Sequence, residues 1–276
     1  MSPTVTPKPP AKRRSRVRLD QLLVDRGLAD TRSKAQALIL AGKVRVGAGD
    51  TARRDRKPGD QVDAEEPIGL DEPDPYVSRG GHKLAAALDA FDIDPMGKTA
   101  LDVGASTGGF TDVLLQRGAR HVYALDVGRG QLAESLRRDA RVTSMERTNA
   151  RTLTDATLPD KVDIAVIDVS FISLDKVLGP VATTLAPQGD IVALVKPQFE
   201  AGKGRTDKGV VRDPAVHREV LERVLANATD HHGLSTRAIV ASPILGPEGN
   251  REFLVHLRAG PTHADLRALI DEVTAA

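Results

Sequence analysis

A glycine-rich loop between an apolar run and a helical pattern constrains this chain more than any other feature. The segment is LDVGASTGGF, residues 101 to 110, in which Gly104, Gly108 and Gly109 follow the apolar run. Glycines let a backbone turn sharply and approach a ligand closely. The spacing is GxxxGG, whereas a dinucleotide-binding loop reads GxGxxG, and no phosphate-binding lysine follows. The loop predicts a ligand site and disfavours a nicotinamide-dependent oxidoreductase. The alternative is a purely structural turn.

Apolar runs of strand length alternate with helical patterns from about residue 78 onward. The predicted strands are Thr99–Val103, His121–Asp126, Arg141–Met145, Val162–Asp168, Asp190–Val195, Thr236–Ala241 and Glu252–Arg258. The predicted helices are His82–Phe91, Thr111–Arg117, Gln131–Arg138 and Pro214–His231. This alternation is typical of a largely parallel sheet with helices on both faces. The loop SPILGPEGN is too short for a parallel crossover, so we expect the last strand to be antiparallel.

Seven strands with a terminal hairpin indicate an α/β fold with a Rossmann-like methyltransferase sheet. Ligands of such sheets bind beyond the carboxyl ends of the strands. Asp126 ends the second strand, where a carboxylate can accept hydrogen bonds from both ribose hydroxyls of an adenosyl ligand. Asp168, Lys196 and Glu252 border later strands. Lys83 lies at the start of the helix before the first strand. A single charged residue next to an apolar strand often only contacts solvent. Four of them at one edge of the sheet predict a functional site.

Charge is distributed unevenly along the chain, although the net charge is only +1. Residues 1 to 62 hold 15 Lys or Arg and 6 Asp, whereas residues 63 to 75 hold six acids and no base. A basic segment of this kind indicates a polyanion partner, and the alternative is a solvated charged face. The acidic stretch contains three prolines, which is typical of a linker. We therefore expect a basic flexible tail at 1–16, a small α+β domain at 17–65, a linker at 66–77, an α/β domain at 78–260 and a C-terminal helix at 261–276.

The segment after the tail has an amphipathic pattern of its own. Leucines at 19, 22 and 23 form one helical stripe that Gly27 ends, and Thr31 can cap a second helix. Short strands are expected at Val44–Val46 and Gln61–Asp63. The cations on the polar side of these elements are the candidate contacts to the polyanion. They are Arg18, Arg32, Lys34, Lys43 and Arg45.

This stretch, RLDQLLVDRGLADTRSKAQALILAGKVRV, resembles the small RNA-binding domain first described in ribosomal protein S4. The resemblance covers about residues 17 to 65 and implies binding to folded RNA through a helix pair and the adjoining loop. Aromatic residues make up only 3% of the chain, which disfavours a base-stacking platform for single strands. We expect recognition through phosphate contacts and RNA shape.

Six further strings occur in order along the chain: SRGGHKL, LDVGASTGGFT, ERTNAR, DVSFISL, LVKPQFE and GNREFL. Together they resemble the TlyA family of ribosomal RNA 2′-O-methyltransferases, which is related to the FtsJ type. With the N-terminal domain, the resemblance covers nearly everything from Arg18 to Arg258. It implies a Lys-Asp-Lys-Glu tetrad, which corresponds here to Lys83, Asp168, Lys196 and Glu252.

The resemblance also implies S-adenosylmethionine as cofactor and a cytidine of ribosomal RNA, within ribosomal subunits, as substrate. Residues expected to hold the cofactor are Asp102, Gly104, Ala105, Ser106, Thr107, Gly108, Gly109, Phe110 and Asp126, with Asn149 as a further candidate on the adenosyl side. In the implied chemistry, Lys196 is the general base for the ribose hydroxyl and Asp168 orients it. Lys83 and Glu252 would position the ribose.

Several other features bear on the class of protein. The chain has no cysteine, which excludes disulfides and thiolate metal sites. No apolar stretch approaches the length of a membrane helix and no secretory pattern is seen, so we expect a cytoplasmic protein without a membrane partner. We also expect a monomer. His231 and His232 show no carboxylate at ligand spacing, so no metal site is expected. Two alternatives stay open, a catalytically inactive RNA- or ribosome-binding protein and a membrane-lysing haemolysin.

Overall fold

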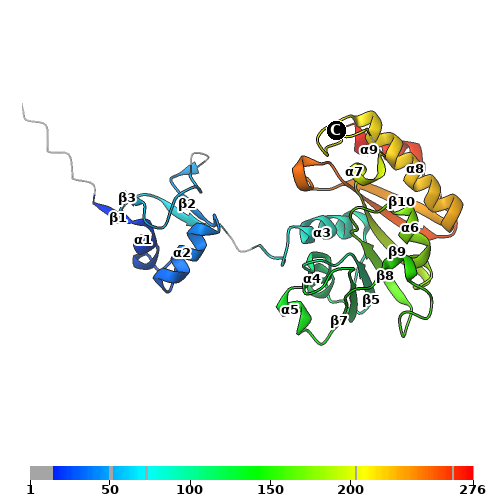
Figure 1. Cartoon of the computed structure of the whole chain (residues 1–276), viewed down its shortest axis with the longest axis horizontal. Coiled ribbons are helices and arrows are strands. Elements are labelled where there is room, and N and C mark those ends of the chain that lie inside the picture. Colours follow the sequence, from blue (N-terminus) through cyan, green and yellow to red (C-terminus); the bar gives the residue numbers. More distant parts are fainter. Residues whose placement is uncertain (1–14, 50–51, 72–73, 203, 263, 276) are drawn as a thin grey trace, which may run out of the picture. The chain divides into compact units, whose positions relative to one another are not determined.

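The computed structural model describes residues 15–49, 52–71, 74–202, 204–262 and 264–275. The chain divides into two compact units, Met1–Pro73 and Asp74–Ala276, and Figure 1 shows the elements of each. Nearly all of the segment predicted as a basic tail lies outside the described residues. Among the described residues, none of the helices combines the length and the apolar character that crossing a membrane requires.

The described residues of the N-terminal unit form two helices and two small antiparallel sheets. Its elements are β1 (Arg16–Arg18), α1 (Leu19–Asp25), α2 (Arg32–Leu40), β2 (Val44–Val46), β3 (Gln61–Asp63) and β4 (Ile68–Leu70). β1 pairs with β3 and β2 pairs with β4. The predicted leucine stripe is buried, and Thr31 caps α2 by accepting a hydrogen bond from the main-chain nitrogen of Lys34 at 3.2 Å. The helices and strands enclose one apolar core.

Two predicted boundaries of this unit are wrong. The tail was expected to include Arg16, which instead begins β1 and pairs with Asp63. The linker was expected to start at residue 66, but β4 lies inside it and pairs with β2. Proline and acidic residues disfavour a strand locally, yet the apolar residues of β4 pack on the core of the unit. Tertiary packing therefore overrides the local composition.

The C-terminal unit is built on a seven-stranded sheet in the order β10-β11-β9-β8-β5-β6-β7. The strands are β5 (Thr99–Val103), β6 (His121–Leu125), β7 (Val142–Met145), β8 (Val162–Ile167), β9 (Leu185–Val195), β10 (Leu234–Ala241) and β11 (Phe253–Ala259). β11 is antiparallel to both of its neighbours, and β5 to β9 are mutually parallel. The predicted fold class is confirmed, including the antiparallel last strand.

Helices cover both faces of this sheet, as Figure 1 shows. They are α3 (Gly80–Phe91), α4 (Gly109–Gln116), α5 (Glu134–Arg137), α6 (Asp175–Ala182), α7 (Pro197–Glu200), α8 (Pro214–His232) and α9 (Leu266–Thr274). Alternate strand residues face opposite ways, so Leu101 packs in the core with α6, α8 and α9, whereas Ala100 packs in the core with α3 and α4. Each fully buried leucine contributes about 1.5–3 kcal/mol. The two cores fix the strand ends from which the site residues project.

Three helices differ from the sequence prediction. The helix predicted at Gln131–Arg138 is only the four-residue α5, and α6 and α7 were not predicted. The sequence does not predict α6 because it contains Gly179 and Pro180, and both residue types disfavour a helix interior. The helix is stabilised by its buried face, which includes Val177, Leu178 and Val181.

Candidate active site

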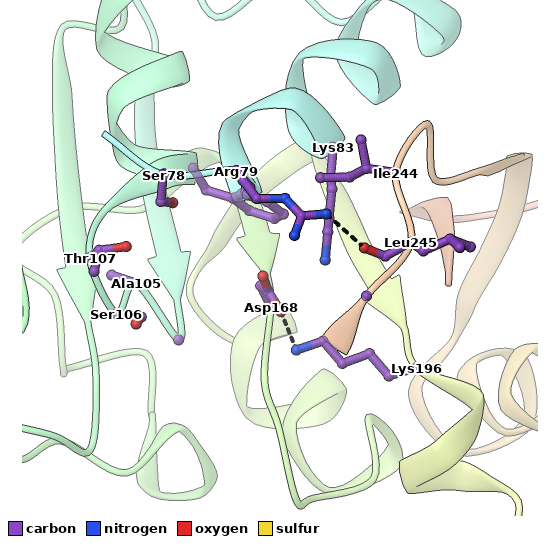
Figure 2. A pocket seen from close by; sticks show the side chains of 15 residues that line it. Ser78, Arg79, Lys83, Ala105, Ser106, Thr107, Asp168, Lys196, Ile244 and Leu245 are labelled. Atoms are coloured by element: carbon purple, nitrogen blue, oxygen red, sulfur yellow. Dashed lines mark hydrogen bonds and ion pairs between the residues drawn. The ribbon is translucent and has the colours of Figure 1, made fainter. Parts of the chain in front are cut away.

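A cavity of about 430 Å³ lies at the carboxyl edge of the parallel strands (Figure 2). Its wall combines the start of α3, the glycine loop after β5, the residues that directly follow β8 and β9, and the loop after β10. The lining residues used below are Ser78, Arg79, Lys83, Gly104, Ser106, Asp168, Lys196, Leu245 and Gly246. Three of the four residues of the expected tetrad therefore line one cavity.

The fourth member, Glu252, lies behind this wall and is paired with Lys83. The Nζ of Lys83 donates to the Oε2 of Glu252 at 2.5 Å, and the two side chains are 9% and 0% exposed. Opposite charges taken out of water together must stay paired, because either alone has a large desolvation cost. Gly246 makes room for the pair, since a Cβ at this position would overlap the carboxylate of Glu252.

Lys196 and Asp168 form the second ion pair of the site. The Nζ of Lys196 lies 2.5 Å from the Oδ1 of Asp168 and donates to the Oγ of Ser170 at 2.8 Å. The two side chains are 11% and 22% exposed, so the pair faces the cavity (Figure 2). Their closeness follows from topology. β8 and β9 are parallel neighbours, and each of the two residues directly follows one of these strands.

A second cavity, of about 890 Å³, lies on the other side of the glycine loop. Gly104, Ser106 and Asp168 line both cavities. The larger one is also lined by Asp126 and Asn149, the two residues that were expected on the adenosyl side. The carboxylate of Asp126 is fixed because it accepts hydrogen bonds from the main-chain nitrogens of Ser106 at 2.8 Å and Gly128 at 2.6 Å. Asp168 therefore stands where the two cavities meet.

The glycine loop has the geometry that its sequence predicts. Gly104 has a φ of +85°, a conformation that residues with a Cβ rarely adopt. A Cβ here would also overlap the main-chain oxygen of Asp168. The loop thus passes close to the end of β8, and Gly104 lines both cavities. The chemistry of this cradle suits an adenosyl ligand, because the main chain at Gly104 carries no side chain and the fixed carboxylate of Asp126 lines the larger cavity.

Two of the expected cofactor residues lie elsewhere. The side chain of Asp102 lines neither cavity; it is fully buried and accepts a hydrogen bond from Thr111 Oγ1 at 2.7 Å. Burial raises the pKa of Asp102 to about 7, although the hydrogen bond from Thr111 acts in the opposite direction. Gly108 also lines neither cavity and packs against Leu132 and Leu136. The other expected loop residues, Ala105, Thr107, Gly109 and Phe110, line the smaller cavity.

The sequence did not single out Arg79, which lines the smaller cavity. Its Nη2 donates to the main-chain oxygen of Leu245 at 3.2 Å and so joins the start of α3 to the loop after β10 (Figure 2). The available signal was its position four residues before Lys83, one helical turn away. Phe171 was also missed. It is 89% exposed in the wall of the larger cavity, and its ring centroid lies 4.8 Å from that of Phe199.

In the N-terminal unit, Asp20 organises two of the predicted RNA contacts. This fully buried carboxylate accepts hydrogen bonds from Arg18 at 3.1 and 3.0 Å and from Arg32 at 3.0 Å. Gln36 donates to it at 2.9 Å. The Arg18 guanidinium is the main reason that the pKa of Asp20 lies far below its ordinary value. Asp20 therefore holds both arginines in defined positions at the surface of the unit.

Two of the other predicted RNA contacts are also paired with acids. Lys34 lies 2.7 Å from Asp30, and Arg45 lies 2.9 Å from Asp71. Arg54 donates to the same Asp71 at 3.0 Å, and this hydrogen bond is the main cause that lowers the pKa of Asp71, with a smaller contribution from Lys43. Part of the acidic stretch thus neutralises the cations around it instead of forming a free linker.

The interpretation of the histidine pair needs a correction. No carboxylate stands at ligand spacing from His231 and His232 along the sequence, which predicts that none lies next to them. The structure places Asp175, the first residue of α6, next to both rings. The contact joins residues that are 56 and 57 positions apart, which local spacing could not indicate.

The sheet with an antiparallel last strand and the glycine loop define the class of protein as a methyltransferase. The FtsJ-like methyltransferase family model matches residues 76–259, and the S4 domain model matches residues 17–47. The 16S/23S rRNA (cytidine-2′-O)-methyltransferase TlyA of Mycobacterium tuberculosis is 48% identical over 88% of this chain and 90% of its own length. Hemolysin A of Brachyspira hyodysenteriae is 41% identical over 87% of this chain and 99% of its own length.

A solved structure from Streptococcus thermophilus, described as that of a candidate hemolysin, matches with a TM-score of 0.73. It is 44% identical and the match covers 94% of each chain. Because these matches cover most of the chain, they identify the particular family. The chain belongs to the TlyA family, with an S4 domain followed by an FtsJ-like methyltransferase domain.

Proposed function

We propose that this protein transfers a methyl group from S-adenosylmethionine to the 2′-hydroxyl of a cytidine ribose in ribosomal RNA. The observation that carries the proposal is the position of Asp168 and Lys196, an ion pair at the junction of two cavities. The larger cavity suits the cofactor, and the smaller one suits the ribose. The substrate named for the TlyA relative supports the choice of RNA and of cytidine.

Gly104 and Ser106 of the glycine loop, together with Asp126 and Asn149, would hold the cofactor in the larger cavity. The carboxylate of Asp126, fixed by two main-chain nitrogens, keeps free lone pairs for the ribose hydroxyls of the ligand. When bound, S-adenosylmethionine supplies an activated methyl group on a positive sulfonium, and positive charge nearby favours the neutral form of a lysine. Much of the acceleration comes from holding the reacting atoms in line.

Lys196 would remove the proton from the ribose hydroxyl. A lysine accepts a proton only as the neutral amine, so Lys196 would first release to solvent the proton that it carries in the ion pair with Asp168. Its contacts with Asp168 and Ser170 fix the position of its Nζ. Asp168 is the orienting group, because its carboxylate contacts the amine directly. Lys196 lines the smaller cavity and its partner Asp168 lines both. The base would therefore lie beside the ribose hydroxyl and leave the line from its oxygen to the methyl group open.

Lys83, Glu252 and Arg79 would position the nucleotide. The buried pair with Glu252 leaves the Nζ of Lys83 with further donors that can reach a ribose oxygen in the cavity. The guanidinium of Arg79, which lines the smaller cavity, has the fork geometry that suits an RNA phosphate. In the N-terminal unit, Arg18 and Arg32 would contact the RNA backbone in the orientation that Asp20 sets.

The experiment measures transfer of labelled methyl from S-adenosylmethionine to separated, unmodified small and large ribosomal subunits. The wild-type protein and Lys196→Ala are compared, with Lys161→Ala as control because Lys161 lies in the loop just before the start of β8 and lines neither cavity. We expect transfer by the wild type and the control and loss of transfer by Lys196→Ala. Cofactor binding without any transfer to either subunit would favour the inactive RNA-binding alternative.

A further inference from the structure

A group of three potential metal ligands lies away from the site described above, where the end of α8 meets the start of α6. The Nδ1 of His231 lies 3.2 Å from the Oδ1 of Asp175, and the Nε2 of His232 lies 3.3 Å from the same oxygen. The three ligand atoms lie within 4.8 Å of one another. None of the three residues takes part in the proposed methyl transfer.

Two of the three separations agree with those around a tetrahedral metal ion. With metal–ligand bonds of about 2.0–2.1 Å, two ligands of a tetrahedral Zn²⁺ are about 3.3 Å apart. Asp175 Oδ1 already stands at this separation from both histidine nitrogens. Two imidazoles and one carboxylate are also a ligand set that Zn²⁺ prefers.

Helix-end electrostatics alone would also favour this contact. A carboxylate at the start of a helix and imidazolium groups at the end of another are each stabilised by the helix dipole. An ion pair of this kind needs only one histidine, whereas here both rings direct a nitrogen at one oxygen.

We propose that Asp175, His231 and His232 form a binding site for a divalent transition-metal ion, with Zn²⁺ as the best match. Three protein ligands leave a fourth tetrahedral position for water. Binding requires one local change. His232 Nε2 contacts the main-chain oxygen of Asp175 at 3.0 Å and must release it, so that the two rings can close on the ion.

A bound ion would fix one wall of the larger cavity. Ser173 and Lys176 flank Asp175 in sequence, and both line that cavity. The same turn is already held by Glu200, whose Oε1 accepts a hydrogen bond from the main-chain nitrogen of Leu174 at 2.8 Å. The metal would add a link between α6 and α8, and binding free energy gained only in the folded state stabilises the fold.

The test titrates untagged full-length protein with Co²⁺, followed by visible absorption, and with Zn²⁺, followed by calorimetry. The variants are Asp175→Ala, His231→Gln and His232→Gln. His82→Ala is the matched control, because His82 also pairs with an aspartate, Asp74, at 3.1 Å. We expect one equivalent of tightly bound ion, a tetrahedral Co²⁺ spectrum, and affinity that falls on the order of tenfold or more in each ligand variant.

The control should bind as the wild type does. Zn²⁺ should raise the unfolding temperature of the wild type and of His82→Ala but not that of His231→Gln. Because this shift in unfolding temperature compares each variant with and without Zn²⁺, the test stays valid if one variant is less stable than the wild type. Equal affinity of the wild type and His231→Gln, or no saturable binding to the wild type, would overturn the proposal.

Discussion

The buried carboxyl of Asp102 gives the most quantitative prediction, namely that replacing it with asparagine removes a pH dependence of stability. Burial raises the pKa of Asp102 from 3.8 to about 7, and the charges of Asp168 and Asp126 act in the same direction. Between these two values the folded state binds more protons than the unfolded state. The stability contributed at low pH is therefore lost as the pH rises through about 7.

The magnitude follows from the width of this window. From pH 5 to pH 8 the wild type passes through the upper part of this window, about 2 pH units between pH 5 and the folded-state pKa of about 7. Its unfolding free energy should fall by about 3 kcal/mol over this range. The amide introduced by Asp102→Asn is neutral at every pH, and its oxygen could still accept the hydrogen bond from Thr111. The stability of Asp102→Asn relative to the wild type should thus increase by about 3 kcal/mol from pH 5 to pH 8.

The assay is urea denaturation of the wild type and of Asp102→Asn at pH 5, 6, 7 and 8. Asp89→Asn is the control, because its hydrogen bond with Arg117 lowers the pKa of Asp89 and leaves it ionised throughout this range. Thr111→Val removes a hydrogen bond that lowers the pKa of Asp102, so the loss of stability should extend to higher pH. A difference between Asp102→Asn and the wild type that stays constant with pH would refute the reasoning.

Three further predictions concern the cavity. Lys83→Met leaves the buried Glu252 without its partner and should lower the unfolding free energy, measured by urea denaturation, by about 3–5 kcal/mol. The double variant Lys83→Met with Glu252→Gln should recover most of this loss, and no recovery would argue against the ion pair. Gly104→Ala places a Cβ on the main-chain oxygen of Asp168 and should weaken S-adenosylmethionine binding, measured by calorimetry, by roughly tenfold or more. An unchanged affinity would contradict the proposed cradle. Arg79→Ala should raise KM for ribosomal subunits more than Arg79→Lys does, with cofactor affinity unchanged; equal KM values would exclude a phosphate contact.

The parts of the site that depend on the parallel sheet could be predicted from the sequence. Asp168 and Lys196 each follow a buried apolar run, and parallel neighbours bring their carboxyl ends to one edge. The GxxxGG loop predicted a turn with a close approach, and Gly104 has both the positive φ and the contact with the end of β8. Strand periodicity and topology rules were sufficient for these features.

Other features depend on contacts between distant segments, which periodicity does not encode. The strand β4 lies in an acidic, proline-containing stretch and exists because β2 offers it a partner. Asp102 borders the glycine loop and was expected to contact the cofactor. Every residue of β5 is buried, so the alternation of side chains along this strand does not tell which of them reaches a ligand site. The contact of Asp175 with the histidines, 56 and 57 residues away, is of the same kind.

The most direct test of the proposed reaction is the position of the transferred methyl group in the RNA. After reaction with labelled S-adenosylmethionine, ribosomal RNA is hydrolysed with alkali, which cleaves only next to a free 2′-hydroxyl. The account predicts label in alkali-resistant dinucleotides that contain cytidine, produced by the wild type and not by Lys196→Ala. Label on a base, released in mononucleotides, would contradict the assignment of Lys196 and Asp168 to a ribose hydroxyl.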